Sequence, residues 1–114
     1  MRVTTAVTTA GGVSARPVAV VHEGRWALIS AGEYDPGRHA ITINLSVVDA
    51  VCARFGDPPA LVKGAILAHE AVHATRASGS TAGDEEAMAR RAACETAGHQ
   101  VVEHIEAVLA GAWT

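Results

Sequence analysis

The chain has 114 residues, of which 49% are hydrophobic and 18% are charged, and its formal net charge is −3. This composition is typical of a folded protein, and the length predicts one domain over residues 1–114. The nine basic residues do not cluster, which argues against a nucleic-acid partner. We find neither a signal-peptide core nor an apolar run of about 20 residues that would span a membrane. A cytoplasmic protein without a membrane partner is therefore expected, and its oligomeric state stays open.

The first part of the chain is rich in β-branched residues and is punctuated by Gly and Pro. Strands are expected, in chain order, at Val3–Thr9, Pro17–His22, Arg25–Ala31 and His39–Leu45. Glu23-Gly24 predicts a tight hairpin between the second and third strands. Asp35-Pro36-Gly37 predicts a turn before the fourth strand, in which Ile41, Ile43 and Leu45 share one face.

Ala-rich helical patterns follow from about residue 46. Helices are expected from an N-cap at Ser46 to about Phe55, from about Ala60 to Ala77, from a Thr81–Asp84 capping pattern to about Thr96, and over His99–Leu109. Gly56 and Ser78-Gly79 stop the first two helices, and Gly98 interrupts the last pair. The fold class predicted is α+β, with a small N-terminal sheet of three to four strands followed by three to four helices.

The two cysteines lie in helical stretches and lack the spacing of metal ligands. Cys52 and Cys94 are interpreted as two buried free thiols that act as small apolar residues. The alternative is a disulfide that joins two helices, and the sequence does not decide between the two.

A His-Glu-x-x-His motif lies in the middle of the second predicted helix. His69 and His73 are four residues apart and share a face with Val62 and Ile66, so both imidazoles point inward and can bind one cation. Glu70 lies about 60° around the helix from His73, given about 100° per residue. At that position a carboxylate can act as general base on a metal-activated water.

This motif and its setting resemble the zincin metallopeptidases. In zincins a sheet precedes the His-Glu-x-x-His helix, and its edge strand pairs with an extended peptide; the resemblance covers residues 17–97 in architecture. It implies a zinc-dependent peptidase with one Zn²⁺ ion, a peptide or protein substrate, and His39–Leu45 as the edge strand.

A catalytic zinc ion needs a third protein ligand. One common zincin continuation, His-x-x-Gly-x-x-His, is absent because its positions hold Arg76 and Gly79. The resemblance then implies a glutamate on the next helix, as in gluzincins and their minimal members, which are about as short as this chain. Three glutamates compete for this role: Glu85, Glu86 and Glu95.

Hairpin geometry favours Glu86, because an antiparallel third helix faces His73 with its opening turn. Glu86-Ala87-Met88-Ala89 also resembles the gluzincin glutamate helix, although Arg90 stands where many members have Asp. Glu85 and Glu95 stay open, and the 21 residues between His73 and Glu95 come nearer the usual gap than the 12 before Glu86.

Under this reading zinc lowers the pKa of its water, and Glu70 moves the proton to the leaving nitrogen. Tyr34, His39 and His99 are candidates for an oxyanion donor. Glu95, His99 and Glu103 are interpreted as a charged solvent face, with a second metal site as the alternative. Two other functions are considered: a catalytically inactive zinc-binding interaction domain and a metal-free helical interaction module.

Overall fold

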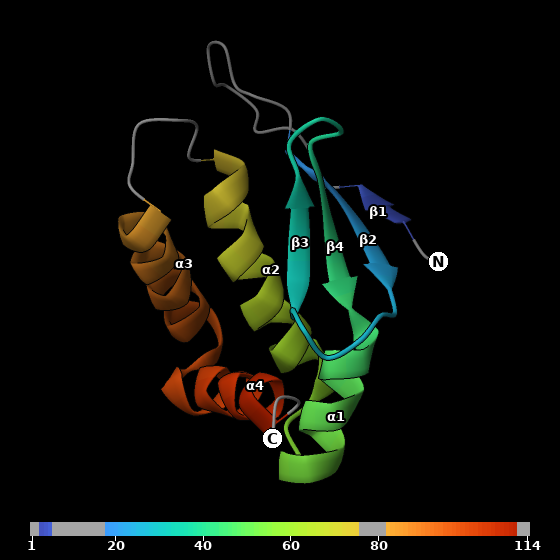
Figure 1. The fold of residues 1–114 in the computed structure, drawn as a ribbon, viewed down its shortest axis with the longest axis vertical. Helices are drawn as coiled ribbons and strands as arrows, with labels where there is room; N and C mark the ends of the chain where they lie inside the picture. Colours follow the sequence, from blue (N-terminus) through green and yellow to red (C-terminus); the bar gives the residue numbers. More distant parts are fainter. Residues whose placement is uncertain (1–2, 6–17, 76–81, 112–114) are drawn as a thin grey trace.

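The computed structural model describes residues 3–5, 18–75 and 82–111. Its elements, in chain order, are β1 (Val3–Thr5), β2 (Val20–Gly24), β3 (Gly32–Asp35), β4 (Ala40–Asn44), α1 (Leu45–Phe55), α2 (Pro59–Thr75), α3 (Ala82–Ala97) and α4 (His99–Gly111). The strands form one sheet, and α2 stands between this sheet and α3 (Figure 1). The predicted α+β class, with the sheet before the helices, is confirmed.

The sheet has the strand order β1-β2-β4-β3. β2 pairs in parallel with β4, whereas β1 and β3 pair antiparallel with β2 and β4. The predicted strand over Val3–Thr9 is present at Val3–Thr5, and its remainder lies outside the described residues. The prediction that His39–Leu45 forms the edge strand is wrong, because β4 lies between β2 and β3. The edge beside α2 belongs to β3.

The predicted strand over Arg25–Ala31 is also wrong, as is the hairpin at Glu23-Gly24. These two residues end β2, and residues 25–31 form a loop that leads from β2 to the far side of β4. The fully buried side chain of Asn44 holds this loop. Asn44 accepts a hydrogen bond from the Trp26 backbone N–H and donates to the carbonyls of Ala27 and Ser30. The Asn44 side chain thus satisfies three backbone groups of the loop that have no strand partner.

Asn44 also caps α1, since its side chain accepts a hydrogen bond from the Ser46 backbone N–H. The predicted N-cap at Ser46 is therefore wrong by two residues. The predicted stop at Gly56 is confirmed, with φ of 79°, and so is the break at Gly98, with φ of 95°. The Ala77 end of the second helix and the Thr81 cap of the third lie outside the described residues.

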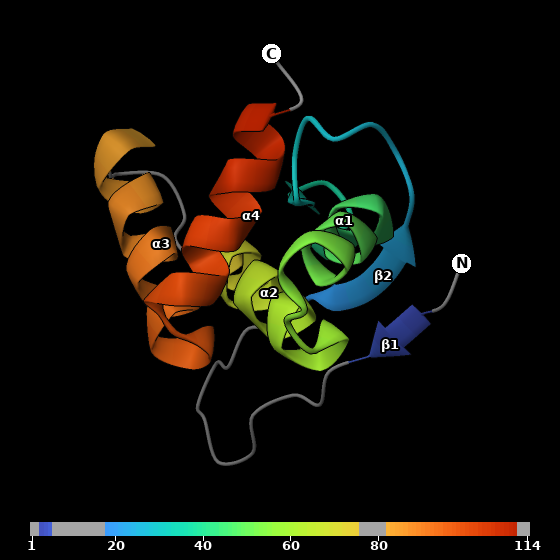
Figure 2. The same ribbon diagram turned by 90° about the horizontal axis from the view of Figure 1, so that it is seen from below.

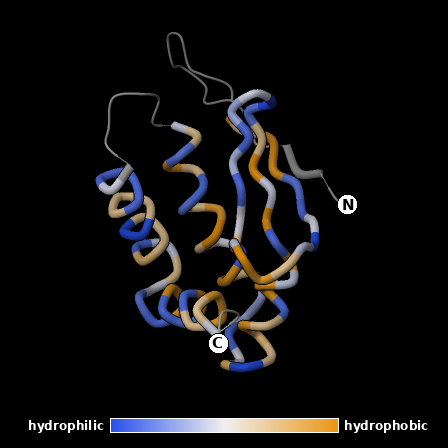
Figure 3. The backbone as a smooth tube through the Cα atoms, in the orientation of Figure 1, coloured by the Kyte–Doolittle hydropathy of each residue, from blue (hydrophilic) through white to orange (hydrophobic). Residues whose placement is uncertain are grey.

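One apolar core joins the sheet, α1, α2 and α4. α4 crosses beneath α2, between α3 and α1 (Figure 2). The buried members of the core are Ile43, Val47, Val48, Val51, Val62, Ala65, Ile66, Ala93, Cys94, Val101, Val102, Ile105 and Val108. α3 contributes only small side chains to the core and shows little strongly hydrophobic colour in Figure 3. Small residues allow α3 to approach α2 closely.

Both cysteines are free thiols, as predicted, with Cys94 buried and Cys52 half-buried. Among the described residues, the helices are all too short or too polar to cross a membrane.

Candidate metal site

His69 and His73 project from the same face of α2. The buried side chains of Val62 and Ile66 occupy this face in the preceding two turns, as the sequence predicts. The two imidazole rings are 5.2 Å apart between centroids, and their side chains are 30% and 20% exposed. The histidines are thus paired at the rim of the core, where solvent still reaches them.

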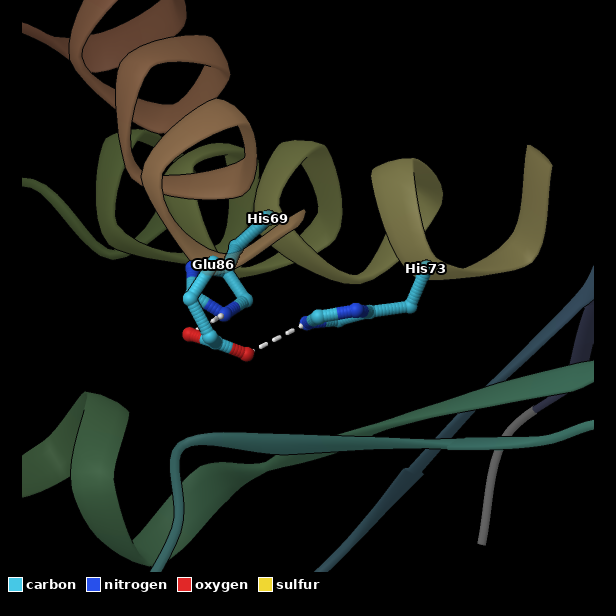
Figure 4. A group of neighbouring side chains, drawn as sticks. All are labelled: His69, His73 and Glu86. Atoms are coloured by element: carbon cyan, nitrogen blue, oxygen red, sulfur yellow. Dashed lines mark ion pairs between the residues drawn. The ribbon is translucent and has the colours of Figure 1, made fainter. Parts of the chain in front are cut away.

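Glu86 reaches both histidines from the opening turns of α3 (Figure 4). Its Oε1 lies 2.9 Å from His73 Nε2, and its Oε2 lies 3.4 Å from His69 Nε2. One ligand atom from each of the three residues lies within 4.8 Å of the others. Two imidazole nitrogens and one carboxylate oxygen form a donor set that suits zinc.

The other two candidate glutamates have different surroundings. Glu85 contacts His73 on its other ring nitrogen, with 3.4 Å between Oε2 and Nδ1. Glu95 is exposed, lies about two and a half turns beyond Glu86 on α3, and does not join the group. His99 and Glu103 are exposed as well, and within residues 18–75 and 82–111 they form no metal-binding group with Glu95. Of the three glutamates, Glu86 alone approaches both histidines.

Glu70 is nearly buried, with 8% of its surface exposed. Burial raises the pKa of its carboxyl group to about 7, because the charged form loses its hydration. His73 opposes this shift in pKa, whereas the carboxylates of Glu86 and Glu33 add to it. A carboxyl group with a pKa near neutrality is matched to proton transfer at physiological pH.

Burial has the opposite effect on His69, whose pKa it lowers. Glu86 and Glu106 oppose this lowering, and His73 adds to it. The pKa shift favours the neutral imidazole, and the neutral form is the one that binds a metal ion.

A cleft of about 600 Å³ extends from the three grouped residues along α2. Its lining is mostly apolar: Ile29, Ser30, Ala31, Gly32, Ala65, Ile66, His69, Glu70, His73, Glu86, Ala87, Arg90, Ala93, Val102, Ile105, Glu106 and Leu109. The loop before β3 forms one side, α3 the other, and α4 closes the lower end in the view of Figure 1. This volume is in the usual range for small-molecule and peptide side-chain sites.

Gly32 brings the start of β3 against the face of α2 that carries Ile66 and Glu70. A Cβ atom at Gly32 would lie 2.8 Å from Ile66 Cγ2 and 3.0 Å from Glu70 Cγ. The Asn44 backbone N–H donates to the Ala31 carbonyl, and Glu33 pairs with Thr42. Because antiparallel pairs alternate, the N–H and C=O of Gly32 and Tyr34 point away from β4, to the free edge of the sheet.

None of the three predicted oxyanion donors lines this cleft. The Tyr34 hydroxyl lies 2.8 Å from His39 Nδ1, so these two candidates contact each other outside the cleft. His99 lines a separate hollow with Glu95. The cationic group that does line the cleft is Arg90, which donates to both carboxylate oxygens of Glu106 at 2.8 and 3.1 Å.

Sequence reasoning missed the loop wall at residues 29–32 and the Arg90–Glu106 pair. No local sequence pattern predicts either feature. The loop wall depends on how the loop packs on β4, and the Arg90–Glu106 pair depends on how α4 packs on α3.

Comparison with models of known protein families, with curated proteins and with solved structures found no match for this chain.

Proposed function

We propose that the protein is a zinc-dependent peptidase of the zincin type, with His69, His73 and Glu86 as metal ligands and Glu70 as general base. One observation carries this proposal: the three ligand atoms lie within 4.8 Å of one another, beside a nearly buried carboxyl group. A purely structural metal site has no use for such a base, so the arrangement favours catalysis.

The donor set argues for zinc over harder cations. Two neutral imidazoles with one carboxylate leave a position for water, as in catalytic zinc sites, whereas calcium and magnesium prefer oxygen ligands alone. When bound, zinc supplies a Lewis acid that lowers the pKa of water and polarises a carbonyl group.

The side chains of the chain itself do the proton transfer and the positioning. Glu70 accepts a proton as water attacks the amide carbon and gives it to the leaving nitrogen as the C–N bond breaks. Burial raises the pKa of this carboxyl group in the metal-free protein, and such a raised pKa supports a role in proton transfer. His69 lies one residue before Glu70 on α2, and His73 lies three residues after it. These two ligands would therefore hold the reacting water and carbonyl group close to the Glu70 carboxyl group.

An extended peptide is the substrate class that the free edge of β3 favours. The outward N–H and C=O groups of Gly32 and Tyr34 can pair with the backbone of a substrate strand. Such backbone pairing contributes to binding whatever the side chains of the substrate are. Apolar walls such as Ile66, Val102 and Ile105 favour a hydrophobic side chain in the cleft. We therefore expect cleavage beside apolar residues.

Cleavage of a mixed peptide pool by the zinc-loaded protein, read by mass spectrometry, tests this function without a known substrate. The matched control is Glu70→Gln, which keeps the shape of the site and all three ligands. We expect wild-type cleavage beside apolar residues, a loss with chelator, and a reduction of about 10² to 10⁴-fold in the variant.

A zinc-loaded wild type that cleaves no more than Glu70→Gln would contradict peptidase activity. Zinc binding without cleavage would favour the inactive interaction domain instead.

A further inference from the structure

We infer that Glu85 is a positioning residue for the metal site: its carboxylate lies beside Nδ1 of His73 and orients the ring so that Nε2 is available to the metal. This inference rests on the proposed function. The Glu85 Oε2 lies 3.4 Å from His73 Nδ1, while Glu86 Oε1 lies 2.9 Å from His73 Nε2. One imidazole is thus contacted by two successive carboxylates, each on a different nitrogen.

Helix geometry explains how neighbours in sequence divide these roles. Successive residues on α3 point about 100° apart, so Glu85 and Glu86 approach the ring from different directions. The Glu85 side chain is 24% exposed and that of Glu86 is 59% exposed. Glu85 is therefore the more enclosed of the two carboxylates, and it contacts His73 without joining the group of ligand atoms.

A carboxylate on the non-ligating nitrogen has two consequences. It fixes the tautomer with the proton on Nδ1, which leaves the lone pair of Nε2 for the metal, and it raises the basicity of the ring. It also adds negative charge: Glu85 and Glu86 both lie against the imidazoles, which favours a divalent cation. Removal of such a partner commonly weakens metal binding by about 10 to 100-fold.

Zinc affinity, measured by competition with a chromophoric chelator, tests this role. The variants are Glu85→Ala, Glu85→Gln and the control Glu103→Ala, an exposed residue of α4. We expect the dissociation constant to rise by about 10 to 100-fold for Glu85→Ala. Glu85→Gln should restore most of the affinity, because its amide oxygen can accept the Nδ1 proton, and Glu103→Ala should match wild type.

The visible spectrum of the Co²⁺-substituted protein separates a positioning residue from a ligand. We expect Glu85→Ala to keep the wild-type band pattern at saturating Co²⁺, with only the affinity reduced. A dissociation constant within about twofold of wild type would overturn the inference, against the 10-fold loss expected as a minimum. A changed coordination spectrum in both Glu85 variants would also overturn it, by making Glu85 a ligand. A wild type that binds no zinc would instead reject the proposed function, and this inference with it.

Discussion

Glu70 combines a buried position with a charge that the protein interior disfavours. Its pKa rises from an ordinary 4.5 to about 7, chiefly through burial. The folded state therefore binds the proton more tightly than the unfolded chain does. Ionisation of Glu70 therefore lowers the free energy of unfolding. This loss is absent below the pKa of the unfolded chain, grows as the pH rises from about 4.5 to 7, and stays constant above pH 7.

Replacement of Glu70 by Gln should remove this cost in the metal-free protein. The gain in unfolding free energy relative to wild type should grow by up to about 3 kcal/mol between acidic and mildly alkaline pH. Urea denaturation at a series of pH values in the presence of chelator measures it, with Glu103→Gln as an exposed control on α4. Parallel stability profiles for wild type and Glu70→Gln would show that burial does not shift this pKa.

Residues of the site differ in how well the sequence alone predicts them. His69, Glu70 and His73 follow from one helix, because their spacing fixes their relative directions. Glu86 required only the assumption that α3 returns antiparallel to α2. Glu85 was an open alternative for the third ligand, but its 3.4 Å approach to Nδ1 was not predicted, since that depends on the rotation of α3 about its own axis.

Among the elements, β3 brings its backbone closest to the candidate base Glu70. Gly32 has no room for a side chain, because a Cβ atom would lie 2.8 Å from Ile66 and 3.0 Å from Glu70. Glycine here sets the distance between the edge strand and Glu70. In the proposed site, the edge strand, the base and the metal ligands therefore form one unit.

Gly32→Ala should strain this contact and destabilise the fold by about 1–3 kcal/mol, as overpacking does elsewhere. Gly83→Ala is the matched control: a Cβ atom there meets nothing within 4 Å, and alanine favours the helix. Urea denaturation of both variants checks the difference. Equal stabilities for Gly32→Ala and wild type would mean that β3 moves away from α2 without cost.

The helices were predictable and the strand order was not, for a physical reason. Helix limits depend on local signals such as Pro59, Gly56 and Gly98, which act within a turn. Residues 25–31 alternate like a strand, yet their backbone groups bond to Asn44, which follows more than ten residues later. No pattern inside the segment carries that information.

At the scale of the whole molecule, the candidate site is assembled from almost every part of a short chain. α2 carries His69, His73 and Glu70, α3 carries Glu86, and the loop before β3 and α4 complete the cleft. α3 packs on α2 with Ala89, Ala93 and Cys94, which are small. A metal ion shared between α2 and α3 would add a link between these two closely packed helices and stabilise the fold on binding.

Zinc content, measured by elemental analysis after dialysis against chelator and return of zinc, tests the central claim most directly. The samples are wild type, His73→Ala, Glu86→Gln and Glu70→Gln. We expect one zinc ion per chain in wild type and in Glu70→Gln, and loss of zinc in the two ligand variants. A wild type that stays free of zinc would contradict the account, and the metal-free helical interaction module would replace it.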